Sequence, residues 1–154
     1  MNRCILDLRG LVLHAYYSDK YHVTQTVEGE DGPVPSAFHA LGKFVEIYLQ
    51  PILKKFQPIQ IIAVLEGKKG NDRRRRINPD YKAPKEQDAD DPTVADEKLK
   101  AIDGVTRLLL HMGASVVSTP YCEADDTIAY LVSKLPGDHV VYTVDQDLLA
   151  LGGP

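Results

Sequence analysis

The chain has 154 residues, a net charge of −4 and 44% apolar residues. This length suits one domain with a buried core, and no apolar run is long enough to span a membrane, so no membrane partner is expected. The negative net charge argues against a general nucleic-acid binder, which leaves only a local basic region for that role. Two distant cysteines and the lack of a signal-peptide pattern predict a cytoplasmic location.

The first predicted element is a short apolar strand that begins at Arg3 and ends at Asp7. Buried strands of parallel sheets are nearly continuous apolar runs, and open α/β sheets bind ligands beyond the carboxyl ends of their strands. Asp7 is therefore the first candidate functional residue. Residues 11–17 predict a helix or turn, and the mixed polar stretch 18–32 predicts a loop.

A helix is predicted next, with Ser36 as its N-cap. Four apolar residues recur at helical spacing along it, namely Phe38, Leu41, Val45 and Leu49. Pro51 is expected to kink or divide this helix, because proline removes a backbone hydrogen bond. The apolar run 59–65 predicts the clearest strand of the chain, and a second carboxylate, Glu66, follows it.

A concentrated basic stretch begins directly after Glu66. A run of charges is often only a solvated surface, and that interpretation stays open. The alternative is contact with nucleic acid, since Lys and Arg attract phosphates and an aromatic ring can stack on a base. The candidate nucleic-acid-binding residues are Lys68, Lys69, Arg73, Arg74, Arg75, Arg76, Tyr81, Lys82 and Lys85. The acidic, proline-bounded stretch 86–92 predicts a mobile connection.

The second half of the chain continues the alternation of helices and strands. Thr93 is predicted to cap a helix that ends at Gly113. The apolar face of that helix consists of Leu99, Ile102, Leu109 and Met112. Residues 114–118 predict a third strand and residues 139–144 a fourth, which leads into Asp145 and Asp147.

Three carboxylates fall within four residues at Glu123, Asp125 and Asp126. Carboxylates this close repel each other and raise one another's pKa values. An acidic first turn of a helix is one explanation, because negative charge stabilises a helix N-terminus. A hard divalent cation that neutralises the cluster is the other. A helix with an apolar face at Ile128 and Leu131 is predicted to follow.

The alternation predicts an α/β fold with a mostly parallel central sheet flanked by helices. The carboxyl ends of parallel strands share one edge, so the acidic residues that follow the strands should converge there. The candidate metal ligands are Asp7, Glu66, Glu123, Asp125, Asp126, Asp145 and Asp147. Carboxylates without a matching His or Cys suit Mg²⁺ or Mn²⁺, and a pair of such ions is typical of phosphodiester hydrolysis.

The chain resembles the N-terminal, resolvase-like (PIN-like) domain of the 5′-nuclease superfamily, the 5′→3′ exonucleases and flap endonucleases of bacteria and phages. The resemblance extends over essentially the whole chain, 1–154. The segments that carry it are 7–17, 32–37, 63–67, 73–76 with 79–83, 123–126 and 144–151. Glu66 stands where the family usually has Asp, and Leu8-Arg9 stands where it has Gly-Ser.

The resemblance implies a three-layer fold and a DNA nuclease of a bacterial or phage-infected cytoplasm, acting on 5′ ends, flaps or branched structures, with RNA left open. It places Asp7, Glu66, Glu123 and Asp125 around a first Mg²⁺ or Mn²⁺ ion. It places Asp125, Asp145 and Asp147 around a second, with Asp126 supporting. The implied catalytic residues are Asp7, Asp125, Lys82 and Arg76. The side chains of Lys82 and Arg76 would contact the phosphates, and no protein nucleophile is expected.

The resemblance also implies that the segment of about 68–93 forms an arch or clamp over the substrate. Family members continue into a helix-three-turn-helix region that grips duplex DNA, which this sequence does not reach, so weak duplex binding is expected. Two other hypotheses stay open: a non-catalytic nucleic-acid-binding or regulatory module on the same fold, and a PIN-type ribonuclease. The intact Asp125, Asp145 and Asp147 favour a nuclease over the non-catalytic module, although Glu66 leaves that module open. The Arg-rich and Tyr-Lys segments favour the 5′-nucleases over a PIN-type ribonuclease.

Overall fold

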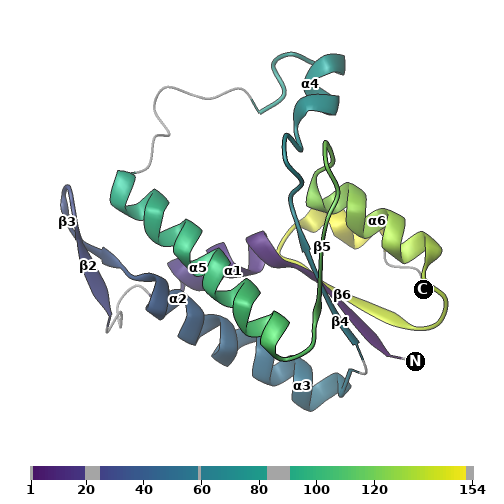
Figure 1. The fold of residues 1–154 in the computed structure, drawn as a ribbon, viewed down its shortest axis with the longest axis horizontal. Helices are drawn as coiled ribbons and strands as arrows, with labels where there is room; N and C mark the ends of the chain where they lie inside the picture. Colours follow the sequence, from purple (N-terminus) through teal and green to yellow (C-terminus); the bar gives the residue numbers. More distant parts are fainter. Residues whose placement is uncertain (1, 20–24, 59, 83–90, 152–154) are drawn as a thin grey trace.

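The computed structural model describes residues 2–19, 25–58, 60–82 and 91–151. Its centre is a sheet of four parallel strands in the order β5-β4-β1-β6 (Figure 1). The strands are β1 (Arg3–Asp7), β4 (Gln60–Leu65), β5 (Ser115–Ser118) and β6 (His139–Tyr142). All four therefore end at the same edge of the sheet, and the predicted α/β fold with a parallel central sheet is confirmed.

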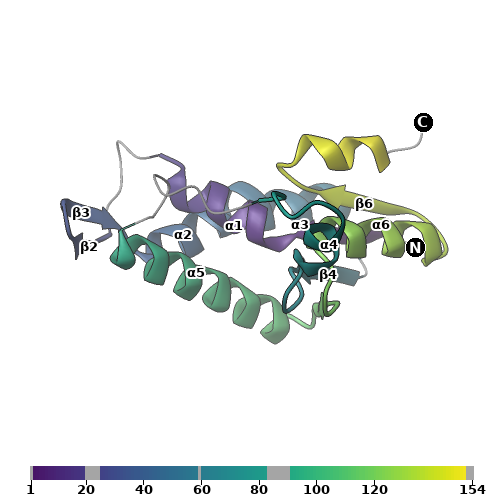
Figure 2. The ribbon, with the colours of Figure 1, turned by 90° about the horizontal axis from the view of Figure 1, so that it is seen from above.

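One face of the sheet is covered by the larger set of helices (Figure 2). They are α1 (Leu8–Tyr17), α2 (Ala37–Phe44), the π-helical turn η1 (Val45–Leu49), α3 (Gln50–Phe56) and α5 (Pro92–His111). Tyr16, Phe44 and Leu109 are fully buried among them. Pro51 is the second residue of α3, and the π-helical turn ends two positions before it, at Leu49. Proline has no backbone amide to donate, so the expected irregularity of the helix lies in the turn that precedes it.

The opposite face carries α6 (Ala124–Lys134) and the 3₁₀-helix η2 (Gln146–Leu151). Ile5, Ile62 and Val64 of the sheet pack there against Ile128 of α6 and Leu148 of η2. Burying each such side chain stabilises the fold by roughly 1.5–3 kcal/mol. Helices on both faces make the domain a three-layer structure. The packing of Ile128 against the sheet holds α6 beside the carboxyl edge.

The prediction of a loop over residues 18–32 is wrong in its second half. Strands β2 (Thr26–Gly29) and β3 (Gly32–Pro35) pair antiparallel, with Val27 opposite Val34. Gly32 allows the turn with a φ of +122°, a backbone region that side chains disfavour. The hairpin was missed because its strands are short and half-exposed and β3 contains two prolines, which leaves no apolar alternation to detect.

The buried faces of two helices also differ from prediction. Phe38 and Leu99 are 73% and 63% exposed. Leu109 is buried as predicted, but the other buried residues of α5 are Glu97, Ala101 and Val105. The predicted cap at Thr93 is wrong too, because the side chain of Asp91 accepts a hydrogen bond from the Thr93 amide at 2.8 Å.

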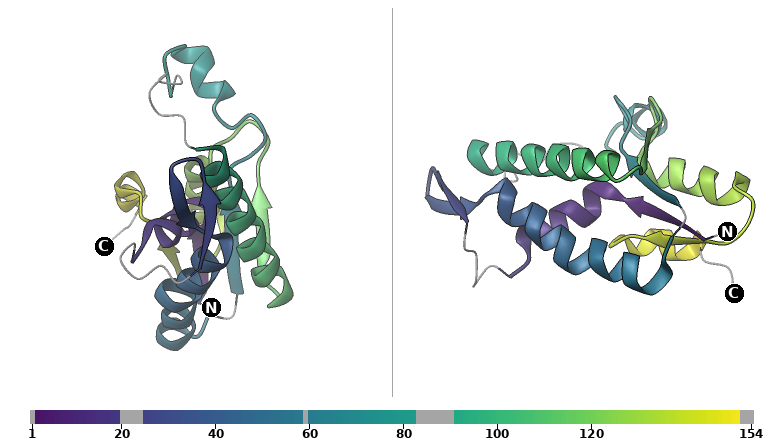
Figure 3. Two further views of the ribbon diagram at one scale, coloured as in Figure 1. Left: turned by 90° about the vertical axis from the view of Figure 1, so that its left-hand side faces the viewer. Right: turned by 60° about the horizontal axis from the view of Figure 1, so that its bottom comes forward.

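A short helix, α4 (Asp72–Ile77), projects beyond the carboxyl edge of the sheet (Figure 3). It holds four consecutive arginines, and none of its residues is buried. The chain around it is described up to residue 82, so the predicted mobile connection over 86–92 lies mostly outside the described residues. Among the helices that are described, none has the length and apolar character needed to cross a membrane.

Candidate metal and nucleic-acid site

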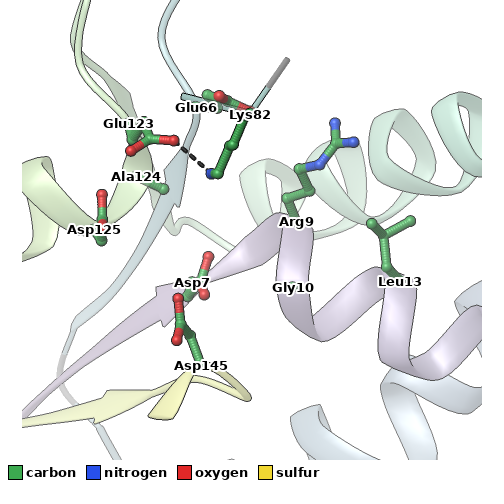
Figure 4. A pocket seen from close by; sticks show the side chains of 10 residues that line it. All are labelled: Asp7, Arg9, Gly10, Leu13, Glu66, Lys82, Glu123, Ala124, Asp125 and Asp145. Atoms are coloured by element: carbon green, nitrogen blue, oxygen red, sulfur yellow. Dashed lines mark hydrogen bonds and ion pairs between the residues drawn. The ribbon is translucent and has the colours of Figure 1, made fainter. Parts of the chain in front are cut away.

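A cavity of about 220 Å³ opens at the carboxyl edge of the sheet. Figure 4 shows acidic side chains facing it from several elements, with Lys82 reaching in among them. Its five carboxylates come from Asp7, Glu66, Glu123, Asp125 and Asp145. The parallel topology explains the meeting, because each carboxylate follows a strand or begins the helix after one. Asp7 and Asp145 thereby line the same cavity, although they are 138 positions apart in the chain.

Asp7 is the last residue of β1 and points its carboxylate into this cavity. Burial raises its pKa, a hydrogen bond from Thr143 lowers it, and the charges of Asp145 and Asp125 raise it again. The net effect is a pKa above the ordinary value for aspartate. Gly10 permits the arrangement, because a Cβ there would lie 3.0 Å from Oδ2 of Asp7.

Thr143 joins the first and last acidic positions. Its hydroxyl donates a hydrogen bond to Oδ2 of Asp7 at 2.9 Å and accepts one from the Asp145 amide at 2.9 Å. This residue was not among the sequence candidates, because a threonine after a strand carries no signal of its own. Its position orients the Asp7 carboxylate towards Asp145.

Glu123, Asp125 and Asp126 form the tightest acidic group. One carboxylate oxygen of each lies within 4.8 Å of the others, and no other three such side chains in the described part of the chain approach so closely. Glu123 precedes α6 and is buried, while Asp125 and Asp126 occupy its first turn. The helix N-terminus favours this negative charge, but it does not neutralise three carboxylates.

Arg74 supplies much of the missing positive charge. Its guanidinium contacts Glu123 and lies 3.1 Å from Oδ2 of Asp125 and 3.0 Å from Oδ1 of Asp126. Burial lowers the pKa of Arg74, but the opposing effect of its hydrogen bonds with Tyr81 and the two aspartates is larger. The net pKa therefore lies above the ordinary value for arginine. Arg74 therefore stays charged and ties α4 to the start of α6.

Tyr81 and Lys82 complete the contacts around Glu123. Nζ of Lys82 lies 2.6 Å from Oε1 of Glu123, and the Tyr81 hydroxyl donates to Oε2 at 3.0 Å. The same hydroxyl accepts from Arg74 at 2.7 Å. The hydrogen bond with Glu123 raises the pKa of Lys82. Two cations and a phenol thus converge on one buried carboxylate.

Other sequence candidates lie elsewhere. Asp147 is exposed and does not line the cavity, although its amide donates to Oδ1 of Asp145 at 3.0 Å. Arg73 and Arg76 are exposed on α4, and Arg75 donates to the Tyr81 and Lys82 carbonyls at 3.3 and 3.2 Å. Lys68 and Lys69 line a neighbouring cavity. Lys85 lies outside the described residues.

The donor atoms around the main cavity fit a hard divalent cation. They are carboxylate oxygens, and no His or Cys lines the cavity. Mg²⁺ and Mn²⁺ prefer such oxygen ligands, whereas Zn²⁺ sites usually recruit His or Cys. Glu123, Asp125 and Asp126 could hold one ion, and Asp7 and Asp145 face the same space from the other side.

Comparison with known protein families gives a match to the family described as 5′-3′ exonuclease, N-terminal resolvase-like domain, over residues 2–153. A search of curated proteins found no match.

Several solved structures share the fold. The bacteriophage T5 D15 protein co-crystallised with metal ions has a TM-score of 0.67 at 16% identity, covering 98% of this chain and 52% of its own. The T5 5′-exonuclease with zinc bound gives 0.64 at 16% identity, covering 98% and 52%. A variant T5 D15 flap endonuclease in a complex with DNA and metal ions gives 0.59 at 14% identity, covering 96% and 50%. The chain thus spans about half the length of these structures.

Proposed function

The chain belongs to the family of 5′-3′ exonuclease N-terminal resolvase-like domains, and from that premise we propose that it is a divalent-metal-dependent 5′-nuclease. Its substrate would be DNA with 5′ ends, flaps or branches, and its reaction the hydrolysis of a phosphodiester bond. The T5 flap endonuclease with the same fold is described in a complex with DNA and metal ions, which supports this choice of substrate.

The observation that carries the proposal is the set of five carboxylates around one cavity, with cationic side chains at its mouth. A purely structural acidic surface would spread these charges into solvent. Here Glu123 is only 4% exposed and is held by Arg74 and Lys82, and burial raises the pKa of Asp7, so ionisation of Asp7 is unfavourable. A carboxyl with a raised pKa that lines a cavity beside other charged groups is typical of functional sites.

We assign the first cation to Asp7, Glu66, Glu123 and Asp125, and the second to Asp125, Asp145 and Asp147 with Asp126 in support. Mg²⁺ fits these oxygen donors, as does Mn²⁺. Bound ions of this kind would supply water activation and stabilisation of the leaving oxygen. Asp147 needs a rotation of its exposed side chain to take part, since it lies outside the cavity.

The basic residues would position the substrate. Lys82 and Arg74 neutralise Glu123 in this structure, and the same side chains would meet the phosphates of a strand drawn into the cavity. Lys82 and Arg76 would contact the scissile and neighbouring phosphates. The exposed arginines of α4 and the lysines at 68, 69 and 85 would hold the strand further out, and Tyr81 would stack on a base. The segment 68–93 would thereby act as an arch over the strand.

The test is cleavage of a 5′-labelled flapped DNA in Mg²⁺ or Mn²⁺ by the unsubstituted chain, Asp125→Asn and Asp103→Asn. Asp103 is a matched control, because it is an exposed aspartate of α5 that pairs with Arg107 away from the cavity. Metal-dependent cleavage that Asp125→Asn loses by at least roughly 10²-fold, and Asp103→Asn retains, is expected.

Two further results would redirect the proposal. Cleavage of a matched RNA strand in preference to DNA would favour a PIN-type ribonuclease. DNA binding and Mn²⁺ binding without cleavage would favour the non-catalytic module, and calorimetric titration with Mn²⁺ distinguishes that case from a site that holds no ion.

A further inference from the structure

A second cavity, of about 400 Å³, adjoins the acidic one and shares Arg9 and Glu66 with it. Its volume falls within the range of small-molecule pockets, roughly 300–1,000 Å³. Four cationic residues line it, namely Arg9, Lys68, Lys69 and Arg75, against two acidic residues, Glu66 and Asp72. Where the first cavity is lined mainly by negative charge, this one has two more cations than anions.

The loop that forms this second cavity is fixed by its contacts with the turn before α6. The Gly67 amide donates to the Cys122 carbonyl at 3.0 Å, and the Tyr121 amide donates to the Lys68 carbonyl at 2.9 Å. Lys69 adopts a φ of +57°, which an L-residue rarely adopts unless its surroundings impose it. The cations of the loop are therefore presented on a backbone arranged before any ligand binds.

Arg9 faces these lysines from a different element. It is an exposed residue of the first turn of α1 and stands across the acidic cavity from α6 (Figure 4). It makes no hydrogen bond or ion pair with another residue in the described parts of the chain, unlike Arg74. An arginine that borders two cavities and has no acidic partner there offers a planar set of donors suited to a phosphate.

We infer that Arg9, with Lys68, Lys69 and Arg75, forms a phosphate-binding pocket for a second phosphate of the nucleic-acid strand, next to the acidic cavity at Glu66. The inference rests on the proposed function for the identity of the ligand. The pocket recognises a phosphate by charge and by fork-shaped donors. That phosphate is either an internal diester or the monoester at a 5′ end, and the two sources give different experimental results.

The experiment measures binding of a 3′-fluorescein single-stranded DNA oligonucleotide by anisotropy in EDTA, over a series of salt concentrations. Arg9→Gln is compared with the unsubstituted chain, with Arg9→Lys, and with Arg107→Gln on the remote surface of α5. Arg9→Gln is expected to weaken binding roughly five- to tenfold at low salt and to reduce the salt slope by about 0.7, the value for one lost phosphate contact on a single strand. Arg9→Lys should retain the slope, and Arg107→Gln should match the unsubstituted chain.

The source of the phosphate follows from repeating the series with a 5′-hydroxyl oligonucleotide. An Arg9 effect confined to the 5′-phosphorylated strand assigns the pocket to the terminal monoester, and an equal effect on both assigns it to an internal diester. Equal affinity and slope for Arg9→Gln and the unsubstituted chain would overturn the inference, as would a failure of the unsubstituted chain to bind. Failure of the proposed function gives a different result. A chain that binds DNA through Arg9 but cleaves no DNA in Mg²⁺ or Mn²⁺ would contradict the nuclease assignment and leave the phosphate pocket supported.

Discussion

Nζ of Lys82 lies 2.6 Å from Oε1 of Glu123, although the two residues are 41 positions apart in the chain. The lysine belongs to the basic segment and the glutamate to the acidic group at α6. Arg74 and Tyr81 reach the same carboxylate. The proposed substrate-binding segment therefore already contacts the proposed metal ligands, and the charges of one compensate the charges of the other.

The first prediction concerns Arg74. Replacement by Gln removes the guanidinium from three carboxylates, one of them buried, and should destabilise the metal-free chain by about 1–2 kcal/mol, because Arg74 is itself one-third exposed. Mg²⁺ should recover part of that loss, since a cation can neutralise the same group. Urea denaturation with and without Mg²⁺ measures both effects.

Arg73→Gln is the matched control for Arg74. Arg73 lies beside it in α4 but is exposed, so its replacement should change the free energy of unfolding by less than about 0.5 kcal/mol. Equal effects of the two substitutions would show that the contacts of Arg74 with the acidic group do not stabilise the fold.

The second prediction concerns the raised pKa of Asp7. A carboxyl whose folded-state pKa exceeds its unfolded value binds protons more tightly when folded, so its contribution to stability falls as pH rises through that range. Asp7→Asn should therefore raise the Tm of the metal-free chain by roughly 1–3 °C near neutral pH. The gain should shrink as pH falls through the raised pKa of Asp7 and vanish below the ordinary pKa of aspartate, where the carboxyl is protonated in both states.

The comparison for Asp7 is Asp103→Asn on α5, which should give no gain at either pH. A Tm increase for Asp7→Asn that persists unchanged at acidic pH would mean that ionisation of Asp7 is not the cause. Thermal denaturation monitored by circular dichroism in EDTA at several pH values distinguishes these results.

The sequence predicted the sheet and the edge where acidic residues gather, because both follow from local patterns. The apolar runs that end at Asp7 and before Glu66 mark strands, and parallel strands share an edge. The partners of those residues depend on contacts distant in sequence. Nothing local indicates that Thr143 bonds to Asp7, or that Arg74 rather than another arginine of the run turns towards α6.

The same limit applies to the hairpin of β2 and β3. It is stabilised from outside by Asp91, whose carboxylate accepts from the Glu30 amide at 2.7 Å and from the Thr93 amide at 2.8 Å. One side chain thus caps α5 and holds the hairpin turn. A pattern read over a short window cannot detect a contact across 61 residues.

The third prediction separates Asp145 from Asp147. Both residues are exposed, but Asp145 lines the acidic cavity and is linked to Asp7 through Thr143, whereas Asp147 lies outside the cavity. Asp145→Asn should reduce metal-dependent cleavage by at least roughly 10²-fold, and Asp147→Asn by less, roughly tenfold. Mn²⁺ affinity from calorimetry should follow the same order. A larger loss for Asp147→Asn would show that its side chain enters the site when ions bind.

The fourth prediction concerns the loop that links the two cavities. A Cβ at Gly67 would lie 1.7 Å from the Thr119 carbonyl oxygen, so Gly67→Ala must push β4 and the turn before α6 apart. It should destabilise the chain by roughly 2–4 kcal/mol. Gly104→Ala is the control, because its Cβ would meet nothing within 4 Å in the middle of α5, and alanine there should stabilise the helix by roughly 0.5–1 kcal/mol.

Urea denaturation measures both glycine variants, and Mn²⁺ titration of the folded Gly67→Ala protein shows whether the loop also matters for the site. Glu66 and Lys68 flank Gly67, and Glu66 borders both cavities. A displaced loop should therefore weaken Mn²⁺ binding and DNA binding together, whereas Gly104→Ala should leave both unchanged. Normal stability for Gly67→Ala would contradict the close approach of this loop to Thr119. It would also remove the reason to regard the two cavities as one fixed surface.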